Sequence, residues 1–353
     1  MMRQYMEAKR ACPDALLLFR MGDFYELFYD DAKIAAQTLN LTLTSREKGD
    51  NAQPMAGFPH HQLESYLAKL LAAGFRVAVC DQVEDPKTAK GLVRREITRI
   101  VTAGTITDEG LLDPKEPNYL AAIVPKEPTG IAWIDLSTGR FFAGVFSMDR
   151  LSDELVRLRP AEVLWPEDAT IGPPTVDGTV VTKRPAWAFA TAQTWPILER
   201  HFGAQAIEGF GFDPEGDDVV ALCAAGAILD YLNETQRTGL PHIERLLRYQ
   251  AGKFMEIDES TWRSLEITRT LRDGHREGSL LWVIDRTITG MGGRLLVDWM
   301  TNPLTDGEAI RRRQDAVAEF MNRPEICGQV RDALAAVYDL ERLLGRVTAG
   351  RCT

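Results

Sequence analysis

The chain has 353 residues, of which 45% are hydrophobic and 26% are charged, so it is globular material too long for one compact core. Its formal net charge of −10 argues against a generic nucleic-acid binder, in which basic residues predominate. The sequence contains no run of about 18 apolar residues, and no hydrophobic signal core follows Met1. We therefore expect a cytoplasmic protein of two or three domains that is neither secreted nor inserted in a membrane.

Charge is unevenly distributed along the chain. Residues 1–103 carry 14 Lys and Arg against 13 Asp and Glu, whereas residues 104–353 carry 27 against 38. Five basic residues close together in the first segment form either a patch that contacts phosphates or a solvated helix face. They are Lys87, Lys90, Arg94, Arg95 and Arg99.

The five cysteines are scattered and odd in number. None belongs to a C-x-x-C pair or lies near a His that would complete a zinc pattern. We therefore expect reduced thiols and no metal site. The cysteines are Cys12, Cys80, Cys223, Cys327 and Cys352.

Residues 1–103 are predicted to form a small α/β domain. Gly22 is a turn signal between two apolar extended runs, so these two strands should form a hairpin. Gly74 follows the second helical stretch and marks its end. The predicted strands cover residues 15–20, 24–28 and 75–80, and the predicted helices cover residues 29–40 and 63–73.

Residues 104–117 are rich in breakers and charge and are predicted to be a linker. A second mixed α/β domain is expected over residues 118–250. Residues 170–215 within it are too rich in Pro and Gly to be assigned. The predicted strands cover 119–124, 130–136, 140–146 and 162–165, and the predicted helices cover 153–158 and 219–233.

Residues 251–353 carry no further strand signal and are predicted to be all-helical. The last predicted helix runs nearly to Thr353 without a closing element that would bury its apolar face, so we expect this helical domain to be incomplete. The predicted helices cover residues 265–271, 279–284, 293–300, 308–321 and 324–344.

The hairpin carries the most informative local pattern. Residues i and i+2 of a strand share a face, so Phe24 and Glu26 should project together while Tyr25 points to the other side. An aromatic at a hairpin end can wedge between base steps, and a carboxylate beside it is repelled by phosphates unless it accepts a hydrogen bond from a base or is protonated. Taken alone, such a run is more often half core and half surface.

Longer blocks resemble the bacterial MutS family of DNA mismatch repair proteins. Met21–Phe28, Asp31–Lys33 and Pro54–His61 resemble the family's mismatch-binding domain. Further blocks, in the family's order, resemble the exit of that domain, the connector domain and the start of the lever or core domain. A paralogue without repair activity is the alternative, although such relatives typically lack the wedge domain. The further blocks are residues 81–86, 99–105, 136–139, 235–237, 265–268, 285–296 and 338–342.

The resemblance implies that Phe24 stacks on the mismatched or unpaired base from the minor groove and that Glu26 hydrogen-bonds this base. Met21 and Asp23 would flank the wedge. Six further residues match positions that face the DNA backbone near the lesion, namely Arg46, Pro54, Met55, Gly57, His60 and His61. His60 stands where the family more often has Tyr. Alternatively, Met55 packs under the hairpin, Gly57 only permits a turn and His61 satisfies a buried backbone group.

The resemblance also implies an RNase H-like α/β connector domain over residues 118–250. Enzymes of this fold hold metal ions with carboxylates, and Asp135 lies on a suitable strand. A two-metal nuclease needs further convergent carboxylates, and Glu162, Asp213 and Asp230 show no recognisable spacing, so catalysis is disfavoured.

Residues 251–353 would then be the N-terminal part of an all-α lever/core domain. Within it, Arg286 and Arg294 are expected to support helix packing rather than to contact DNA.

The resemblance implies duplex DNA with a mismatch or a small insertion/deletion loop as ligand. A MutL-type partner would dock through the acidic connector domain, which could instead be the main role of the chain. Family members form homodimers and bind ATP and Mg²⁺ through a C-terminal domain, yet no G-x-x-x-x-G-K-[ST] phosphate loop occurs in this chain. We therefore expect a monomeric, nucleoid-associated chain that binds no cofactor and is not an enzyme.

Overall fold

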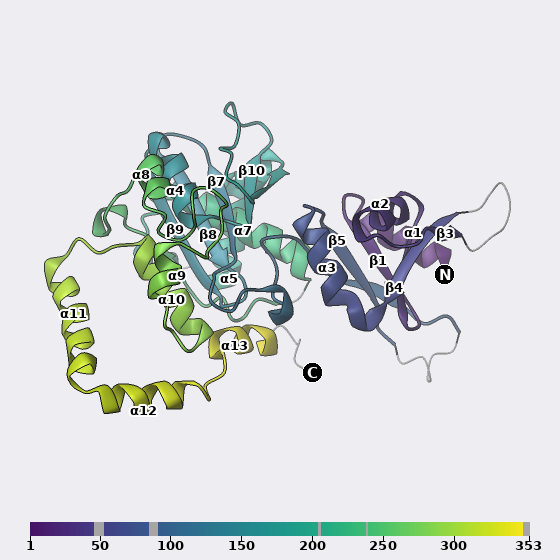
Figure 1. Cartoon of the computed structure of the whole chain (residues 1–353). Helices are drawn as coiled ribbons and strands as arrows, with labels where there is room; N and C mark the ends of the chain where they lie inside the picture. The colour runs from purple at the N-terminus through teal and green to yellow at the C-terminus, as the bar shows by residue number, and fades with distance from the viewer. Residues whose placement is uncertain (46–52, 85–90, 204–205, 238, 349–353) are drawn as a thin grey trace. The chain divides into compact units, whose positions relative to one another are not determined.

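The computed structural model describes residues 1–45, 53–84, 91–203, 206–237 and 239–348. The chain divides into two compact units, one formed by Met1–Leu111 with Tyr231–Gly239 and the other by Leu112–Asp230 with Leu240–Thr353. Each unit contains a six-stranded sheet (Figure 1). Among the described helices, none is long and apolar enough to cross a membrane. The expectation of a multidomain protein with mixed α/β sheets is confirmed.

The sheet of the first unit has the strand order β3-β4-β2-β1-β5-β6, and only β1 and β5 pair in parallel. The predicted β1–β2 hairpin and the strand at β5 are confirmed. Strands β3, β4 and β6 were not predicted: β3 has only two residues, prolines bound β4 and charged residues interrupt β6. The strands are β1 (Leu16–Met21), β2 (Phe24–Phe28), β3 (Thr44–Ser45), β4 (Pro54–Pro59), β5 (Val77–Gln82) and β6 (Arg95–Val101).

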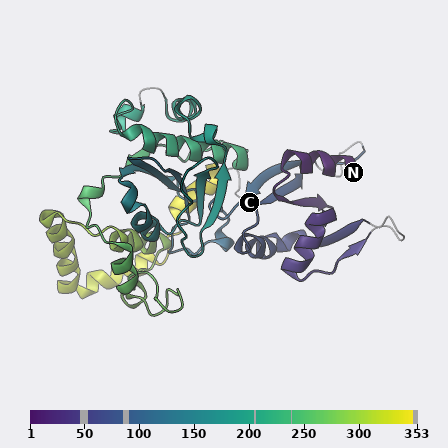
Figure 2. The same ribbon diagram turned by 90° about the horizontal axis from the view of Figure 1, so that it is seen from above.

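Helices cover both faces of this sheet (Figures 1 and 2). The two predicted helices, α2 (Tyr29–Leu39) and α3 (Leu63–Ala72), pack on one face with alternate residues of β1 and β2. An unpredicted helix, α1 (Met2–Ala11), packs on the other face through Tyr5, its only buried residue. Because both faces are covered, β1 is apolar and buried from Leu16 to Phe19 rather than alternating.

The sheet of the second unit has the order β11-β10-β7-β8-β9-β12. Strands β7, β8 and β9 form an antiparallel meander, and β10, β11 and β12 each pair in parallel with a neighbour. The four predicted strands are confirmed. The strands are β7 (Tyr119–Val124), β8 (Thr129–Asp135), β9 (Arg140–Phe146), β10 (Glu162–Pro166), β11 (Val180–Arg184) and β12 (Leu246–Arg248).

The two helices predicted in this α/β part, at residues 153–158 and 219–233, are confirmed as α4 and α7. The stretch left unassigned at 170–215 contains β11 and two helices, one of which has Pro196 inside it. The helices are α4 (Leu151–Leu158), α5 (Thr191–Phe202), α6 (Ala206–Gly209) and α7 (Asp218–Gln236).

The remaining helices follow from residue 259 onward, and the only described β pairing after Asp258 is an isolated bridge between Phe254 and Leu304. The helix predicted over 265–271 is wrong, because Leu265 and Leu271 are exposed and Glu266 adopts a positive φ of 46°. The helix predicted over 324–344 is two helices. The helices are α8 (Glu259–Ser264), α9 (Leu280–Ile284), α10 (Gly290–Thr301), α11 (Gly307–Asn322), α12 (Pro324–Leu334) and α13 (Leu340–Thr348).

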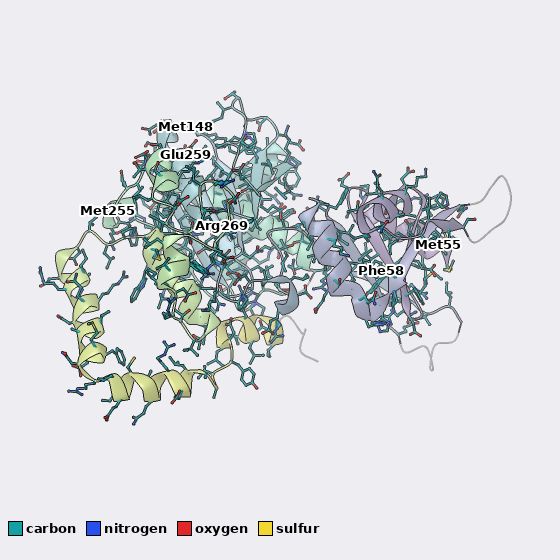
Figure 3. All side chains as sticks on the ribbon, in the orientation of Figure 1. Met55, Phe58, Met148, Met255, Glu259 and Arg269 are labelled. Atoms are coloured by element: carbon teal, nitrogen blue, oxygen red, sulfur yellow. The ribbon has the colours of Figure 1, made fainter. Side chains whose placement is uncertain are left out.

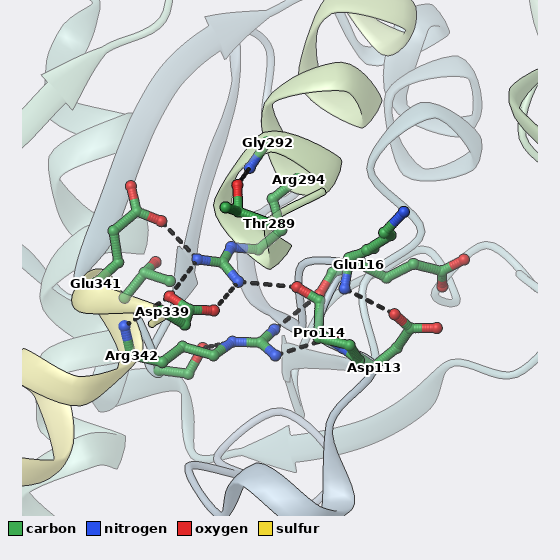
Figure 4. A network of polar contacts seen from close by, with 12 residues as sticks. Asp113, Pro114, Glu116, Thr289, Gly292, Arg294, Asp339, Glu341 and Arg342 are labelled. Carbon is green, nitrogen blue, oxygen red and sulfur yellow. Dashed lines mark hydrogen bonds and ion pairs between the residues drawn. The ribbon is translucent and has the colours of Figure 1, made fainter. Parts of the chain in front are cut away.

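Arg294 on α10 is buried and fixes two distant segments (Figure 4). Its guanidinium donates to both carboxylate oxygens of Asp339 (2.6 and 2.9 Å) and to the carbonyl of Pro114 (2.9 Å). It also pairs with Glu341 at 2.7 Å. These contacts confirm that Arg294 supports packing. Arg286 is exposed and donates to the neighbouring carbonyl of Asp285 (3.0 Å).

Arg342 on α13 makes a second buried junction, also visible in Figure 4. Its two Nη atoms donate to the carbonyls of Asp113 (2.8 Å) and Glu116 (2.9 Å). Its Nε donates to Ser137 Oγ (3.1 Å), at the end of β8. The segment between the two α/β domains is therefore held by side chains from the last helix.

Candidate nucleic-acid interface

The β1–β2 hairpin turns at Gly22 and Asp23, with Met21 paired to Phe24. Gly22 adopts a φ of +60°, which a glycine at the first central position of a two-residue hairpin turn takes without steric cost. His60 reinforces this turn: its backbone N–H (2.8 Å) and its Nδ1 (3.1 Å) both contact the carbonyl of Asp23. The turn of the hairpin is thus held by its own strand pairing and by the contacts of His60.

The side chains of β2 alternate as predicted. Phe24 is 46% exposed, Tyr25 is 3% exposed and Leu27 is fully buried, while Glu26 is half-buried. Strand pairing places Phe24 between Met21 and Pro59. An exposed aromatic ring and a carboxylate therefore lie on one face, two residues apart.

Gly57 on β4 lies directly opposite Glu26. A Cβ at this position would lie 2.9 Å from the carbonyl oxygen of Tyr25 and 3.4 Å from Glu26 Cγ. The alternative that Gly57 only permits a turn is wrong, because it is in the middle of a strand. Its lack of a side chain leaves room for the carboxylate of Glu26.

We predict that Gly57→Ala lowers the free energy of opening of β2 by about 1–3 kcal/mol, because a methyl group would press on the backbone of its neighbour. Native-state hydrogen exchange of the β2 amides measures this separately from the second unit. Gly172→Ala is the control, since no atom lies within 4 Å of its Cβ position. Equal protection of β2 in both variants would contradict the assigned role of Gly57.

Tyr25 anchors β2 from its buried side. Its hydroxyl donates to Asp81 Oδ1 (2.5 Å), and Thr98 Oγ1 donates to Asp81 Oδ2 (3.3 Å). The guanidinium of Arg20 lies 5.6 Å from the centre of the Tyr25 ring. Burial raises the pKa of Tyr25, so its hydroxyl remains a neutral donor. Sequence spacing gave no signal for Tyr25 and Asp81 as positioning residues.

The remaining residues of β4 and the segment after it differ in exposure. Pro54 and Met55 are half-buried, and Met55 packs on the cluster formed by α1 and Phe28, which supports the alternative that it packs under the hairpin (Figure 3). His61 is exposed, so it is wrong that it satisfies a buried group; His60 contacts a carbonyl instead. Arg46 lies outside the described residues.

The described residues of the predicted basic patch have different surroundings in the structure. Arg99 is largely buried, and its Nη1 donates to both carboxylate oxygens of Asp108 (2.7 and 2.9 Å). Arg95 donates to the carbonyl of Arg20 (2.6 Å) and so supports the hairpin. Arg94 is exposed and pairs with Glu96. Lys87 and Lys90 lie outside the described residues. Among the described residues of this patch, Arg95 and Arg99 lie on strand β6 and not on a helix face.

The carboxylates considered for a nuclease each have separate partners. Asp135 is buried and accepts from Ser137 Oγ (2.6 Å), and burial raises its pKa. Glu162 accepts from Thr182 (2.6 Å), and Asp230 pairs with Arg184 (3.2 Å). The described residues contain no group of three or more His, Cys, Asp or Glu that could hold a metal ion. The four cysteines in the described part of the chain are free.

Comparisons with known proteins agree along the chain. Family profiles match MutS domain I at residues 1–110, MutS domain II at 118–244 and MutS domain III at 260–353. A protein named DNA mismatch repair protein MutS from Rhodopirellula baltica is 55% identical over 374 residues, covering 99% of this chain and 42% of the relative. Proteins of the same name from Symbiobacterium thermophilum and Pelotomaculum thermopropionicum are 45% and 44% identical, each covering 99% of this chain and 41% of the relative.

Three consecutive matches on this two-sheet architecture define a multidomain protein with MutS domains I, II and III in chain order. The chain belongs to the MutS family. It spans about two fifths of the length of the curated relatives that it matches.

Proposed function

We propose that this chain recognises mismatched or unpaired bases in duplex DNA, as the first step of mismatch repair, by inserting Phe24 as a wedge between base steps. The observation that carries the proposal is the exposed ring of Phe24 beside Glu26 at the tip of a braced hairpin. This hairpin lies in the part of the chain that matches MutS domain I. Met21, Pro59 and Gly57 border the same face.

The free energy of inserting a ring at such a site is more favourable at a lesion than in intact duplex. Unstacking a base step costs a few kcal/mol, and the cost is least where pairing is already faulty. The carboxylate of Glu26 adds a second criterion, because it is repelled by phosphates unless a base offers it a hydrogen bond. Deformability and hydrogen bonding together therefore select the mispair.

Fluorescence anisotropy with the 353-residue chain tests this proposal. Three duplexes of one length would be titrated at one low salt concentration: a matched duplex, one with a G·T pair and one with a single unpaired base. We expect tighter binding to both lesion duplexes than to the matched duplex. Equal affinity for all three would contradict mismatch recognition by this chain.

Glu26→Gln separates the role of the carboxylate from that of the ring. Removing a negative charge near phosphates should tighten binding to the matched duplex by about fivefold, because the repulsion of about 1 kcal/mol is lost. Discrimination between duplexes would then fall. Glu7→Gln, at a carboxylate that is 58% exposed on α1, is the matched control. Unchanged matched-duplex affinity in Glu26→Gln would oppose the repulsive role.

We also propose that the second sheet belongs to an RNase H-like connector and that residues from α8 onward begin the lever or core domain. The meander β9-β8-β7 followed by parallel β10 and β11 supports the first assignment. The acidic balance of residues 104–353 supports a MutL-type docking partner. Dimerisation and the use of ATP with Mg²⁺ are proposed for other parts of such proteins, since this sequence contains no phosphate loop.

A further inference from the structure

A cavity of about 380 Å³ in the second unit is not used by the proposed DNA site. Its walls come from the ends of β7, β8 and β9, the end of α4 and one face of α10. Its size falls within the usual range for small-molecule sites, about 300–1,000 Å³. Arg269, labelled in Figure 3, contributes to its rim.

One wall of the cavity is a set of packed aromatic rings. Trp133 stacks on Phe142 with ring centres 5.4 Å apart, and Tyr249 meets Trp133 edge-on at 5.2 Å. Phe254 stacks on Tyr249 at 5.4 Å. Phe142, Tyr249 and Phe254 are half-buried, so their outer surfaces are accessible to a planar ligand.

Arg157 completes this wall and is already fixed there. Its guanidinium lies 4.7 Å from the centre of the Tyr249 ring and 5.6 Å from that of Trp133. It pairs with Glu154 (2.6 Å) and donates to Asn302 Oδ1 (2.8 Å). The aromatic surface is therefore held rigid before any ligand enters.

Two polar groups that line the cavity have unused donors. Within the described residues, the side chain of Arg159 makes no hydrogen bond or ion pair, and neither does the hydroxyl of Tyr119. Arg159 also has a positive φ of 46°, a conformation that costs a residue with a Cβ and that glycine would adopt freely. An arginine at this position suggests that its side chain is used.

Arg157 and Arg269 are paired with Glu154 and Glu116, so among the described lining arginines Arg159 is the one whose charge no ion pair neutralises. Arg159 is exposed at the cavity, and Arg269 is a nearby like charge. Two of the lining carboxylates are occupied: Glu116 accepts from Arg269 (2.6 Å), and Asp298 accepts from Arg140 (3.3 Å). The third, Asp177, is exposed and forms no ion pair among the described side chains.

We propose that this cavity binds a small planar ligand with an anionic group, of the nucleoside monophosphate class. The ring would lie on the aromatic wall, and the phosphate would be held by Arg159 with a hydrogen bond from Tyr119, while Arg269 stays paired with Glu116. Asp177 would accept from hydroxyl or amino groups of the same ligand. The guanidinium of Arg159 suits a phosphate because its donors match two phosphate oxygens.

Isothermal titration calorimetry of the 353-residue chain tests the site with AMP, adenosine and inorganic phosphate. We expect AMP to bind at one site, and adenosine and phosphate each to bind at least about tenfold more weakly, because each keeps only one of the two recognised groups. Absence of AMP binding at millimolar concentration would overturn the proposal. Phosphate or adenosine binding as tightly as AMP would overturn it too.

Two variants locate the site. Arg159→Gln should weaken AMP binding about tenfold and leave adenosine binding within about twofold, since only the phosphate contact is lost. Tyr119→Phe keeps the ring and removes the hydroxyl, so it should weaken AMP binding by a smaller factor. Arg312→Gln, at an exposed arginine on α11 outside the cavity, should bind as the unaltered chain does. Unaltered AMP affinity in both Arg159→Gln and Tyr119→Phe would refute the assignment.

Discussion

Phe24→Ala is expected to weaken binding to a G·T duplex by about tenfold or more, because an aromatic ring stacked on a base contributes about 1–3 kcal/mol. Binding to the matched duplex should change by less than about threefold, since an intact step resists the insertion that creates the stack. Anisotropy titrations of the two duplexes at the same salt concentration measure both quantities. The ratio of the two affinities is the informative value, because salt-dependent phosphate contacts affect both duplexes.

A matched control exists for this substitution. Phe320 on α11 is 43% exposed, close to the 46% of Phe24, so Phe320→Ala removes the same ring from a similarly exposed place. It should leave both affinities unchanged. Equal loss on matched and mismatched duplex in Phe24→Ala would show that the ring serves general DNA contact, and the wedge role would have to be abandoned.

Arg294→Met is expected to destabilise the second unit by about 3–5 kcal/mol, because removing one partner of a buried ion pair leaves the other uncompensated. The group left behind is Asp339, whose side chain is 16% exposed. Pro114 would also lose a donor to its carbonyl. Urea unfolding, followed by hydrogen exchange of the β7–β9 amides, measures the loss.

The effect of Arg294→Met should depend on pH. Burial raises the pKa of the Asp339 carboxyl, but hydrogen bonds and charge from Arg294 outweigh this, and the net pKa is lowered below 3.8. A lowered folded-state pKa contributes stability that is present above the unfolded pKa and is lost as pH falls through the folded value. The difference between the unaltered chain and the variant should therefore shrink below about pH 4.

The control for this prediction is Arg323→Met, directly after the end of α11. Arg323 and its partner Glu319 are 60% and 59% exposed, and such surface pairs contribute at most about 1 kcal/mol. A similar stability loss in both variants would mean that arginine removal acts through general charge rather than through the buried junction. A loss confined to Arg294→Met would support the junction.

Sequence periodicity predicted the elements that have one clear apolar face. The β1–β2 hairpin, α2 and α3 were found because their apolar residues recur at strand or helix spacing. Helix α1 was missed, since Tyr5 alone is buried on it. The helix expected at residues 265–271 shows the opposite error: Leu265 and Leu271 are 54% and 66% exposed and only Ile267 among its apolar residues is buried, so no continuous apolar face stabilises a helix there.

In the candidate site, too, local sequence pattern predicted some features and missed others. Alternation along β2 predicted that Phe24 and Glu26 share a face while Tyr25 is buried. It could not predict that Tyr25 is tied to Asp81, because that contact joins residues 56 positions apart. Nor could it predict the role of Gly57, which depends on the pairing of β2 with β4. Long-range pairing supplies what local pattern lacks.

The hydrogen bonds between Arg342 and the segment before β7 affect the order in which the chain folds during its synthesis. Its hydrogen bond to Asp113 joins residues 229 positions apart. At about 5–20 residues per second, translation delays this closure by about ten seconds or more after residue 113 is made. During that interval the carbonyls of Asp113 and Glu116 must be satisfied by water. We therefore expect the first unit to fold on the ribosome while the segment that follows it is still unattached.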